Sequence, residues 1–290
     1  MIFPMKKISL ILFFPIVLLA GHLLYLYTHR EFTPPDFKDN FVRGFEGRGL
    51  LPDAQVLEAL SQPYSYLGHG KQMTAFESAD HRYVIKFINP RAVIKENAFH
   101  KVKGLKRLCS LRWFSSAYFK KNQRLTKLFN RYQVAFQELK EESGLVYVRL
   151  DPCISFPQEI HLIDKEGKHH QLSLNNCPFV LQKKAIVATK LFQQLSEKGD
   201  QEGLKKCGEQ LYDLFLTRAK KGYTDRIQTL HNNYGFVDGR AIQIDLGRIW
   251  KDEEVQQLPQ KEVERIVANI TQSSSCPSQV GDALREYLIR

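Results

Sequence analysis

The stretch LHNNYGFVDGRAIQIDLGRI, residues 230 to 249, combines a hairpin signal with polar residues that a hairpin does not need. Asp238-Gly239 between two apolar runs predicts a two-residue turn. Asn232 and Asn233 precede the first strand, and Asp245 ends the second. Oxygen ligands at neighbouring strand ends suit a hard cation such as Mg²⁺, particularly one that also holds nucleotide phosphates. The stretch therefore predicts a magnesium site at one end of a hairpin.

The rest of the chain has the composition of a folded protein behind a hydrophobic N-terminus. Its 290 residues are 43% hydrophobic and 25% charged, which is enough for one large or two small domains with a core. Residues 8 to 27, ISLILFFPIVLLAGHLLYLY, carry no formal charge and are long enough to cross a bilayer as a helix. A cleaved signal peptide is the alternative, but no small-x-small cleavage site is evident and the apolar run continues past Gly21. We predict an uncleaved single-pass anchor within residues 1 to 30.

Charge and cysteine content bear on the compartment. The charges flanking the anchor give an ambiguous orientation, because lysines precede it and further basic residues follow it. The basic residues are Lys6 and Lys7 before it, and Arg30, Lys38, Arg43 and Arg48 after it. The five cysteines are widely spaced and form no CxxC or Cys/His metal pattern, which favours a reducing compartment. We expect the domain after the anchor to lie in the cytoplasm.

Beyond the anchor, strand patterns come first and helix patterns follow. Residues 31 to 52 have the composition of a linker, with Pro34-Pro35 and mixed charge. Residues 53 to 184 predict a small β-rich lobe, with three strands between 64 and 88 and a second strand-rich block from 144 to 184. Residues 185 to 290 predict a mainly helical lobe, including a helix from about 202 to 221. The order indicates an α+β fold with two lobes.

This order of motifs resembles the protein-kinase-like superfamily, which also contains aminoglycoside-type phosphotransferases. The resemblance spans about residues 64 to 250. It consists of a glycine-containing strand-turn-strand, the lysine of Val84-Ile85-Lys86, a hinge-like Phe179-Val180-Leu181, a helix, and an Asn-bearing loop that leads to Asp-Leu-Gly. The chain is similar to a divergent, membrane-anchored bacterial member of that superfamily. The resemblance implies a two-lobed fold that binds ATP and Mg²⁺.

Carried over by position, the resemblance assigns roles to individual residues. Lys86 would hold nucleotide phosphates, and the turn with Gly68, Gly70 and Lys71 would cover them. Asn233, or its neighbour Asn232, and Asp245 would bind Mg²⁺. The glutamate that pairs with Lys86 would be Glu138, on a helical run just before the next strand, with Glu96 as the alternative.

The same loop departs from the family pattern at the catalytic aspartate. The family places an aspartate five residues before the metal-binding asparagine, where this chain has Ile227 or Gln228. Asp225 is the nearest carboxylate and would serve as the catalytic residue if the loop is longer here. His231 is another candidate base.

One basic segment belongs to no family motif. Residues 91 to 131 contain twelve Lys or Arg residues and one acid, with aromatic residues among them. We interpret it as a helical insertion in the small lobe that contacts anionic lipid, since the chain already has an anchor. A solvated insertion is the alternative, and nucleic acid is not favoured because no nucleic-acid-binding fold is indicated.

These observations lead to three hypotheses. The first is a membrane-anchored phosphotransferase that uses ATP and Mg²⁺ and acts on a hydroxyl of an unknown protein or small molecule. The second is a pseudokinase, a binding or scaffold module that kept the fold and lost catalysis. The third is an anchored structural protein without a nucleotide site.

Overall fold

The structure is a computed structural model that describes Leu18 and residues 33–42, 45, 47, 49–90, 92–93, 124–225 and 229–289. The chain divides into two units, Met1–Thr33 and Pro34–Arg290, and the elements below belong to the second. Among the described residues, no helix combines the length and apolar character that a bilayer span requires. The predicted anchor, apart from Leu18, and most of the basic segment lie outside the described residues, so both stay predictions.

The described elements follow the predicted α+β order, with most strands in the first part and most helices in the second. The first part contains η1 (Pro34–Phe37), α2 (Ala54–Leu60), β1 (Tyr64–His69), β2 (Met73–Ser78), β3 (Tyr83–Ile88), α5 (Arg124–Glu138), α6 (Lys140–Ser143), β4 (Leu145–Arg149), β5 (Glu159–Ile163), β6 (His169–Ser173), η2 (Leu174–Asn176) and β7 (Phe179–Lys183). The second contains β8 (Ile186–Val187), α7 (Ala188–Glu197), α8 (Gln201–Lys220), β9 (Tyr223–Asp225), α9 (Leu230–Asn233), β10 (Tyr234–Val237), β11 (Arg240–Gln243), β12 (Ile249–Lys251), α10 (Glu253–Gln257), α11 (Pro259–Thr271) and α12 (Ser278–Ile289).

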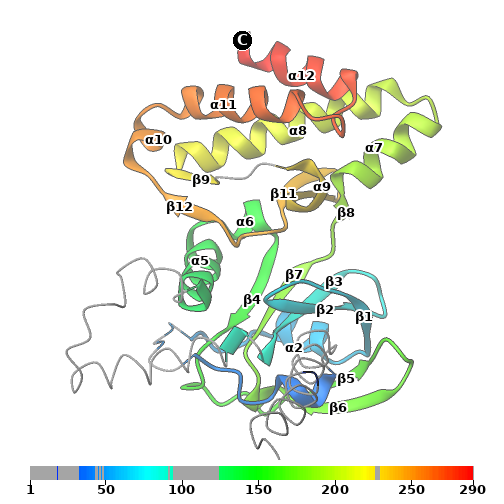
Figure 1. Ribbon diagram of the computed structural model, residues 1–290, viewed down its shortest axis with the longest axis vertical. Helices are drawn as coiled ribbons and strands as arrows, with labels where there is room; N and C mark the ends of the chain where they lie inside the picture. Colours follow the sequence, from blue (N-terminus) through cyan, green and yellow to red (C-terminus); the bar gives the residue numbers. More distant parts are fainter. Residues whose placement is uncertain are drawn as a thin grey trace, which may run out of the picture. The chain divides into compact units, whose positions relative to one another are not determined.

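The first part is built on a seven-stranded sheet in the order β4-β7-β3-β2-β1-β5-β6 (Figure 1). All neighbouring strands are antiparallel except β1 and β5, which pair in parallel. The three strands predicted between residues 64 and 88 are confirmed as β1, β2 and β3. Strand β3 is an interior strand of this order, and its backbone pairs with β2 on one edge and with β7 on the other.

The segment predicted as a linker packs onto this sheet where the structure describes it. Phe37 is fully buried, and its ring stacks on Phe87 with centroids 5.1 Å apart. The buried side-chain amide of Asn40 donates to the carbonyl of Ile88 at 3.1 Å. The prolines and charges around Phe37 have the composition of a linker. Burial of the aromatic side chain on the sheet nevertheless stabilises the packed arrangement.

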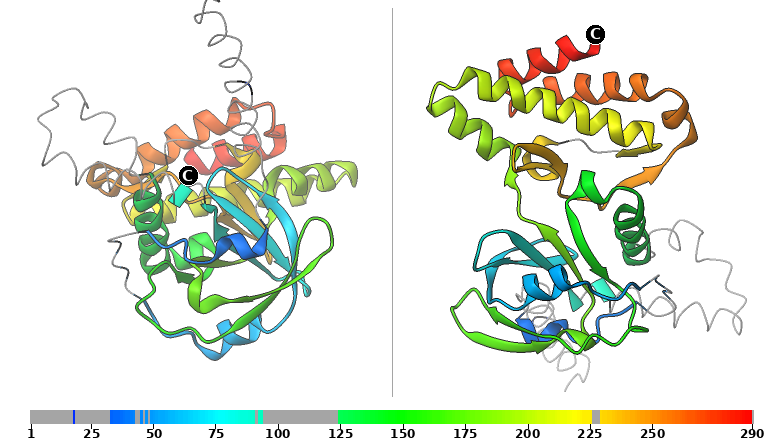
Figure 2. Two further views of the ribbon diagram at one scale, coloured as in Figure 1. Left: turned by 60° about the horizontal axis from the view of Figure 1, so that its bottom comes forward. Right: turned by 180° about the vertical axis from the view of Figure 1, so that it is seen from behind.

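The second part is mainly helical, and most of its other helices pack against the long helix α8. Asp200 caps α8 by accepting from the Gly203 N–H at 2.8 Å, and α11 and α12 lie against the same helix (Figures 1 and 2). The apolar residues predicted at helical spacing in α8 are all buried in one cluster with residues of α11 and α12. The helix predicted between about residues 202 and 221 is thereby confirmed.

The hairpin of the opening stretch is confirmed as β10 and β11. Val237 pairs with Arg240, and the turn residues Asp238 and Gly239 both have positive φ, 49° and 77°. Such a turn matches the right-handed twist of the strands. Phe179-Val180-Leu181 lies inside β7, so the connector between the two parts is Lys184-Ala185 rather than this apolar segment. An apolar run of this length suits a central strand better than an exposed connector.

Candidate functional site

Lys86 connects the sheet to the β10–β11 hairpin. It lies in β3, and its ammonium group donates to the Gln182 side-chain oxygen at 2.6 Å and to the Ile244 carbonyl at 3.0 Å. Gln182 belongs to β7, whereas Ile244 directly follows β11. The lysine therefore bridges two parts of the chain, which the sequence prediction did not anticipate.

The surroundings of Lys86 change its proton affinity. Burial of the ammonium group lowers the pKa of Lys86 from 10.5 to about 8, and the carboxylate of Asp245 acts in the opposite direction. An ammonium group is disfavoured away from water unless an opposite charge compensates it. The Asp245 carboxylate is thus near enough to interact with Lys86, as the site prediction requires.

Asn233 and Asp245 meet at the open end of the hairpin. The backbone N–H of Ile244 donates to the Asn233 carbonyl at 2.8 Å, which places Asn233 opposite the residue before Asp245. Asn233 is buried and Asn232 is exposed. The Asp245 side chain is exposed, and its Oδ1 accepts from the Gly247 N–H at 2.8 Å.

This donor set fits Mg²⁺ better than a metal held by protein ligands alone. Within the described ranges, no group of three or more His, Cys, Asp or Glu side chains is arranged to hold a metal. Mg²⁺ is commonly bound by one or two carboxylates together with phosphate oxygens and water. The exposed carboxylate of Asp245, with Asn233 paired to the preceding residue, is compatible with that requirement.

Helix α5 holds the Asp-Leu-Gly segment in place. Leu246 is fully buried in the same apolar cluster as Leu128 and Phe129 of α5. The Arg131 guanidinium donates to the Gly247 carbonyl. Burial raises the pKa of Tyr132, and the negative charge of Asp245 raises it further. Helix α5 therefore contacts the two residues that follow Asp245.

Glu138 does not pair with Lys86, contrary to the sequence prediction. It is the last residue of α5, and its carboxylate contacts the ammonium group of Lys251 at 3.3 Å. A hydrogen bond from Tyr223 is the main cause that lowers the pKa of Glu138. Sequence order alone does not show which side chain of the neighbouring elements reaches Lys86. Glu96, the alternative, lies outside the described residues.

Gln182 takes the contact that was predicted for a glutamate. Its oxygen accepts from Lys86, and its Nε2 donates to the Ser143 carbonyl at 2.6 Å. The side chain is almost completely buried. A buried amide in the otherwise apolar strand FVLQK was the signal that could have identified it.

The glycine turn is tied to the strand that carries Lys86. The Asn89 side chain donates to the Gly70 carbonyl at 2.9 Å and accepts from the Thr74 hydroxyl at 2.7 Å. A Cβ at Gly68 would meet no atom within 4 Å, and one at Gly70 would come no nearer than 3.8 Å to any. Lys71 is exposed. The backbone of this turn is thus open to the close approach of a ligand.

Asp225 is brought to the same hairpin but faces inward. It ends β9, its side chain is 1% exposed, and its Oδ2 accepts from Gln243 Nε2 at 2.7 Å. The Arg265 guanidinium donates to the Asp225 carbonyl at 3.4 Å. His231 is exposed in α9. The structure therefore places the Asp225 side chain in the interior, against Gln243 of β11, and Gln243 lies two residues before Asp245.

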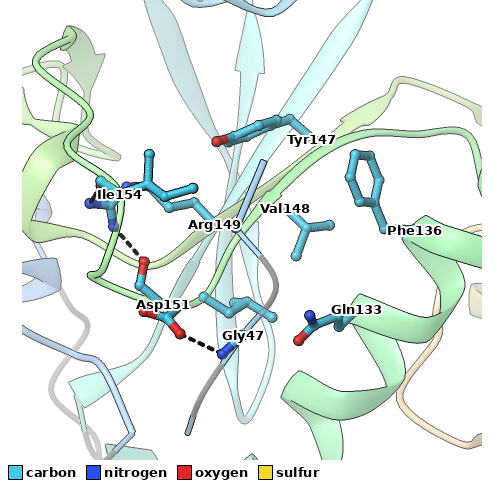
Figure 3. A pocket seen from close by; sticks show the side chains of 10 residues that line it. Gly47, Gln133, Phe136, Tyr147, Val148, Arg149, Asp151 and Ile154 are labelled. Atoms are coloured by element: carbon cyan, nitrogen blue, oxygen red, sulfur yellow. Dashed lines mark hydrogen bonds between the residues drawn. The ribbon is translucent and has the colours of Figure 1, made fainter. Parts of the chain in front are cut away.

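Two hollows lie away from these residues. Figure 3 shows the first, a cavity of about 20 Å³ between α5, β4 and the segment that contains Gly47, whose N–H donates to the Asp151 carboxylate. The second is a cleft of about 550 Å³ lined by β9, β12, α10 and α11, including Thr224 and Trp250. The first has room only for water. Neither is lined by Lys86, Asn233 or Asp245.

The order of these elements is the order that the resemblance implies. A turn between two strands precedes the strand with Lys86, helix α5 leads into β4, and β7 continues through a short connector into the helical part. The β10–β11 hairpin then brings Asp-Leu-Gly to Lys86. These elements and contacts are the ones expected of the protein-kinase-like fold that the resemblance implies.

Comparison with known proteins gives similarities to solved structures only. No protein-family model and no curated protein matches the chain. The Rv3197–erythromycin complex from Mycobacterium tuberculosis is 13% identical with a TM-score of 0.38, over 81% of this chain and 62% of that one. The ROP18 kinase domain in complex with AMP-PNP and sucrose is 12% identical with a TM-score of 0.37, over 77% and 72%. WbdD with the kinase inhibitor LY294002 is 12% identical with a TM-score of 0.32, over 76% and 45%. The chain thus spans less than two thirds of the first and third of these chains.

The titration of Lys86 can be followed directly. In the full chain with ¹³C-methylated lysines, we expect the NMR signal that Lys86→Arg removes to titrate with a midpoint near 8. Asp245→Asn should move the midpoint lower, because the ammonium group loses a nearby negative charge. Since the pKa in the folded protein lies below the usual 10.5, the cost of burying the charge is present below pH 8 and is relieved as the pH rises towards 10.5. A midpoint above about 10, near the ordinary value for lysine, would contradict the burial that the structure shows.

Proposed function

We propose that the chain is a membrane-anchored, kinase-like phosphotransferase that binds ATP with Mg²⁺ and transfers a phosphoryl group to a hydroxyl acceptor. The observation that carries this proposal is the hydrogen bond from the Lys86 ammonium group to the Ile244 carbonyl at 3.0 Å. It joins the cation of the sheet to the segment that carries Asp245. In this proposal, the Lys86 cation, the Asp245 carboxylate and the Asn233 amide act together on the phosphates and their Mg²⁺.

In this proposal each residue has a distinct task. Lys86 holds the phosphates, and Gly68, Gly70 and Lys71 lie over them. Asn233 and Asp245 hold Mg²⁺, which when bound neutralises charge on the phosphates. With a pKa near 8, Lys86 is mostly protonated at neutral pH, and a bound phosphate would raise its pKa further. Nucleotide affinity should therefore decline as the pH rises above this range.

Asp225 is proposed to orient the acceptor hydroxyl and accept its proton. Its position at the end of β9, directly before the loop to Asn233, supports this role. Its burial and its hydrogen bond to Gln243 instead favour the second candidate, a pseudokinase that binds nucleotide without efficient transfer.

Binding of Mg²⁺ and ATP is tested by thermal shift of the full chain in detergent. A ligand that binds only the folded state adds about 2.7 kcal/mol of stability at one hundred times its Kd. We expect Mg·ATP to raise the Tm of the wild type, and Asp245→Ala to remove most of the increase, because the cation loses its carboxylate. Lys86→Ala should reduce the increase in Tm that ATP causes, both with and without Mg²⁺. Asp282→Asn, on an exposed part of α12, is the control and should behave as wild type. No shift in the wild type would refute nucleotide binding.

A variant of Asp225 tests whether the chain is an enzyme or a pseudokinase. A residue that orients the acceptor acts mainly in the transition state, so Asp225→Asn should lower kcat by about 10² to 10⁴. The Kd for ATP should stay nearly unchanged, because the amide of the variant keeps an oxygen that can still accept from Gln243. The measurement is phosphate transfer from labelled ATP to protein and small-molecule acceptor mixtures. If the wild type binds ATP but transfers nothing in a broad screen, the pseudokinase candidate is favoured.

We also propose that residues 8 to 27 anchor the chain, with residues 28 to 290 in the cytoplasm where ATP is available. Contact of residues 91 to 131 with anionic lipid is part of the same proposal, because each basic residue near such a surface contributes about 1 kcal/mol. A C-terminal alkaline phosphatase fusion tests the orientation, since that enzyme requires an oxidising exterior. We expect an inactive fusion. An active one would contradict both the orientation and the use of cytoplasmic ATP.

A further inference from the structure

A chain of polar side chains lies in the interior behind the proposed metal site. It consists of Arg218 of α8, Gln243 of β11 and Asp225 of β9, and none of these side chains is more than 1% exposed. Arg218 Nη1 donates to Gln243 Oε1 at 2.6 Å, and Gln243 Nε2 donates to Asp225 Oδ2 at 2.7 Å. A buried cation and a buried carboxylate are thus joined through one amide.

The charges at its two ends determine the orientation of that amide. An amide oxygen can only accept and an amide nitrogen can only donate. The Arg218 guanidinium requires the oxygen of Gln243, so the nitrogen must face the opposite way. From there Nε2 donates to Asp225 and also to the backbone carbonyl of Asp245 at 3.1 Å.

The polar chain therefore ends on the residue proposed to bind Mg²⁺. The backbone beside Asp245 has a second fixed point, because Ile244 donates to the Asn233 carbonyl at 2.8 Å. Gln243 adds a contact to Asp245 itself from the interior side. The placement of the Asp245 carboxylate then depends on a side chain that does not touch the metal or the nucleotide.

Burying these three polar side chains has a cost in folding free energy that packing alone does not explain. Within the described part of the protein, the buried Nε of Arg218 has no hydrogen-bond partner, and the buried Tyr234 hydroxyl lies beside the same guanidinium. A buried donor left unpaired is destabilising, and apolar side chains of similar volume often replace a buried ionic group without loss of stability. Departures of this kind from the local rules are expected where they serve a site.

We propose that Arg218, Gln243 and Asp225 form a relay that positions Asp245 for Mg²⁺, with Gln243 as the positioning residue and Arg218 acting through it. The proposal rests on the proposed function, because it requires that Asp245 holds Mg²⁺ beside a nucleotide. It adds Arg218 and Gln243, which no sequence motif indicated. In this proposal the buried Asp225 side chain has a positioning role, which does not require contact with an acceptor.

The test compares nucleotide affinity with and without the metal. We would titrate the full chain in detergent with AMP-PNP in excess Mg²⁺ and in EDTA. Gln243→Met keeps the side-chain volume and removes the hydrogen bonds, so affinity in Mg²⁺ should fall about tenfold, as for other residues that orient metal ligands. Affinity in EDTA should change by less than about twofold, because the contacts that do not involve the metal remain.

A double variant tests whether Arg218 acts through Gln243. If it does, Arg218→Met combined with Gln243→Met should weaken binding in Mg²⁺ no more than Gln243→Met alone. Leu284→Ala is the matched control, because Leu284 is fully buried in the same helical cluster but lies outside the relay. It should lower the Tm and leave the ratio of the two affinities unchanged. If Gln243→Met does not fold, Arg218→Lys keeps the charge, loses the planar donor geometry and is measured in the same way, with a fall in the Mg²⁺ affinity expected.

The outcomes separate this inference from the proposed function. If the wild type does not bind AMP-PNP more tightly in Mg²⁺, the proposed function fails and the relay proposal fails with it. If the wild type shows that dependence and Gln243→Met changes only the Tm, as Leu284→Ala does, the relay is structural and this inference alone is overturned. Selective loss of the Mg²⁺-dependent affinity in Gln243→Met supports it.

Discussion

The hydrogen bond from Lys86 to the Ile244 carbonyl is the contact on which the proposed site depends. It extends from the middle of the seven-stranded sheet to a hairpin more than 150 residues later in the chain. A lysine that is partly withdrawn from water keeps its charge only near compensating groups. Asp245 supplies the compensating charge, and Gln182 and the carbonyl supply the acceptors. The same contacts therefore hold the hairpin against the sheet and keep Lys86 protonated.

Helix α5 and the interior of the helical part hold Asp245 from different sides. On the α5 side, the burial of Leu246 and the bond from Arg131 to Gly247 secure the residues after the carboxylate. On the interior side, Gln243 bonds to the Asp245 carbonyl. Fixing the backbone on both sides reduces the freedom of a short loop segment whose own side chain is exposed. A metal ligand held this way loses little further entropy on binding.

Pattern and turn chemistry predicted much of the fold. The Asp-Gly turn and the alternation on either side of it identified the hairpin, and the spacing in α8 identified a helix with one buried face. These signals are local, so a single sequence contains them in full. The linker prediction was wrong because the burial of that segment depends on a contact that is distant in sequence. Whether Phe37 is buried depends on a partner surface at Phe87, about fifty residues further along the chain, and no local pattern reports that.

The sequence by itself determined which residue types could form a phosphate and magnesium site, and in what order they occur. Lys86, Asn233 and Asp245 follow from their positions at the ends or in the middle of recognisable strands. Only the tertiary structure decided their partners. It gave Lys86 an amide, Gln182, in place of Glu138, and it turned Asp225 towards Gln243 and the interior. The reason is physical: strand and helix periodicity determine which face of an element is buried, but the partner of a buried polar group depends on which other elements pack against that face.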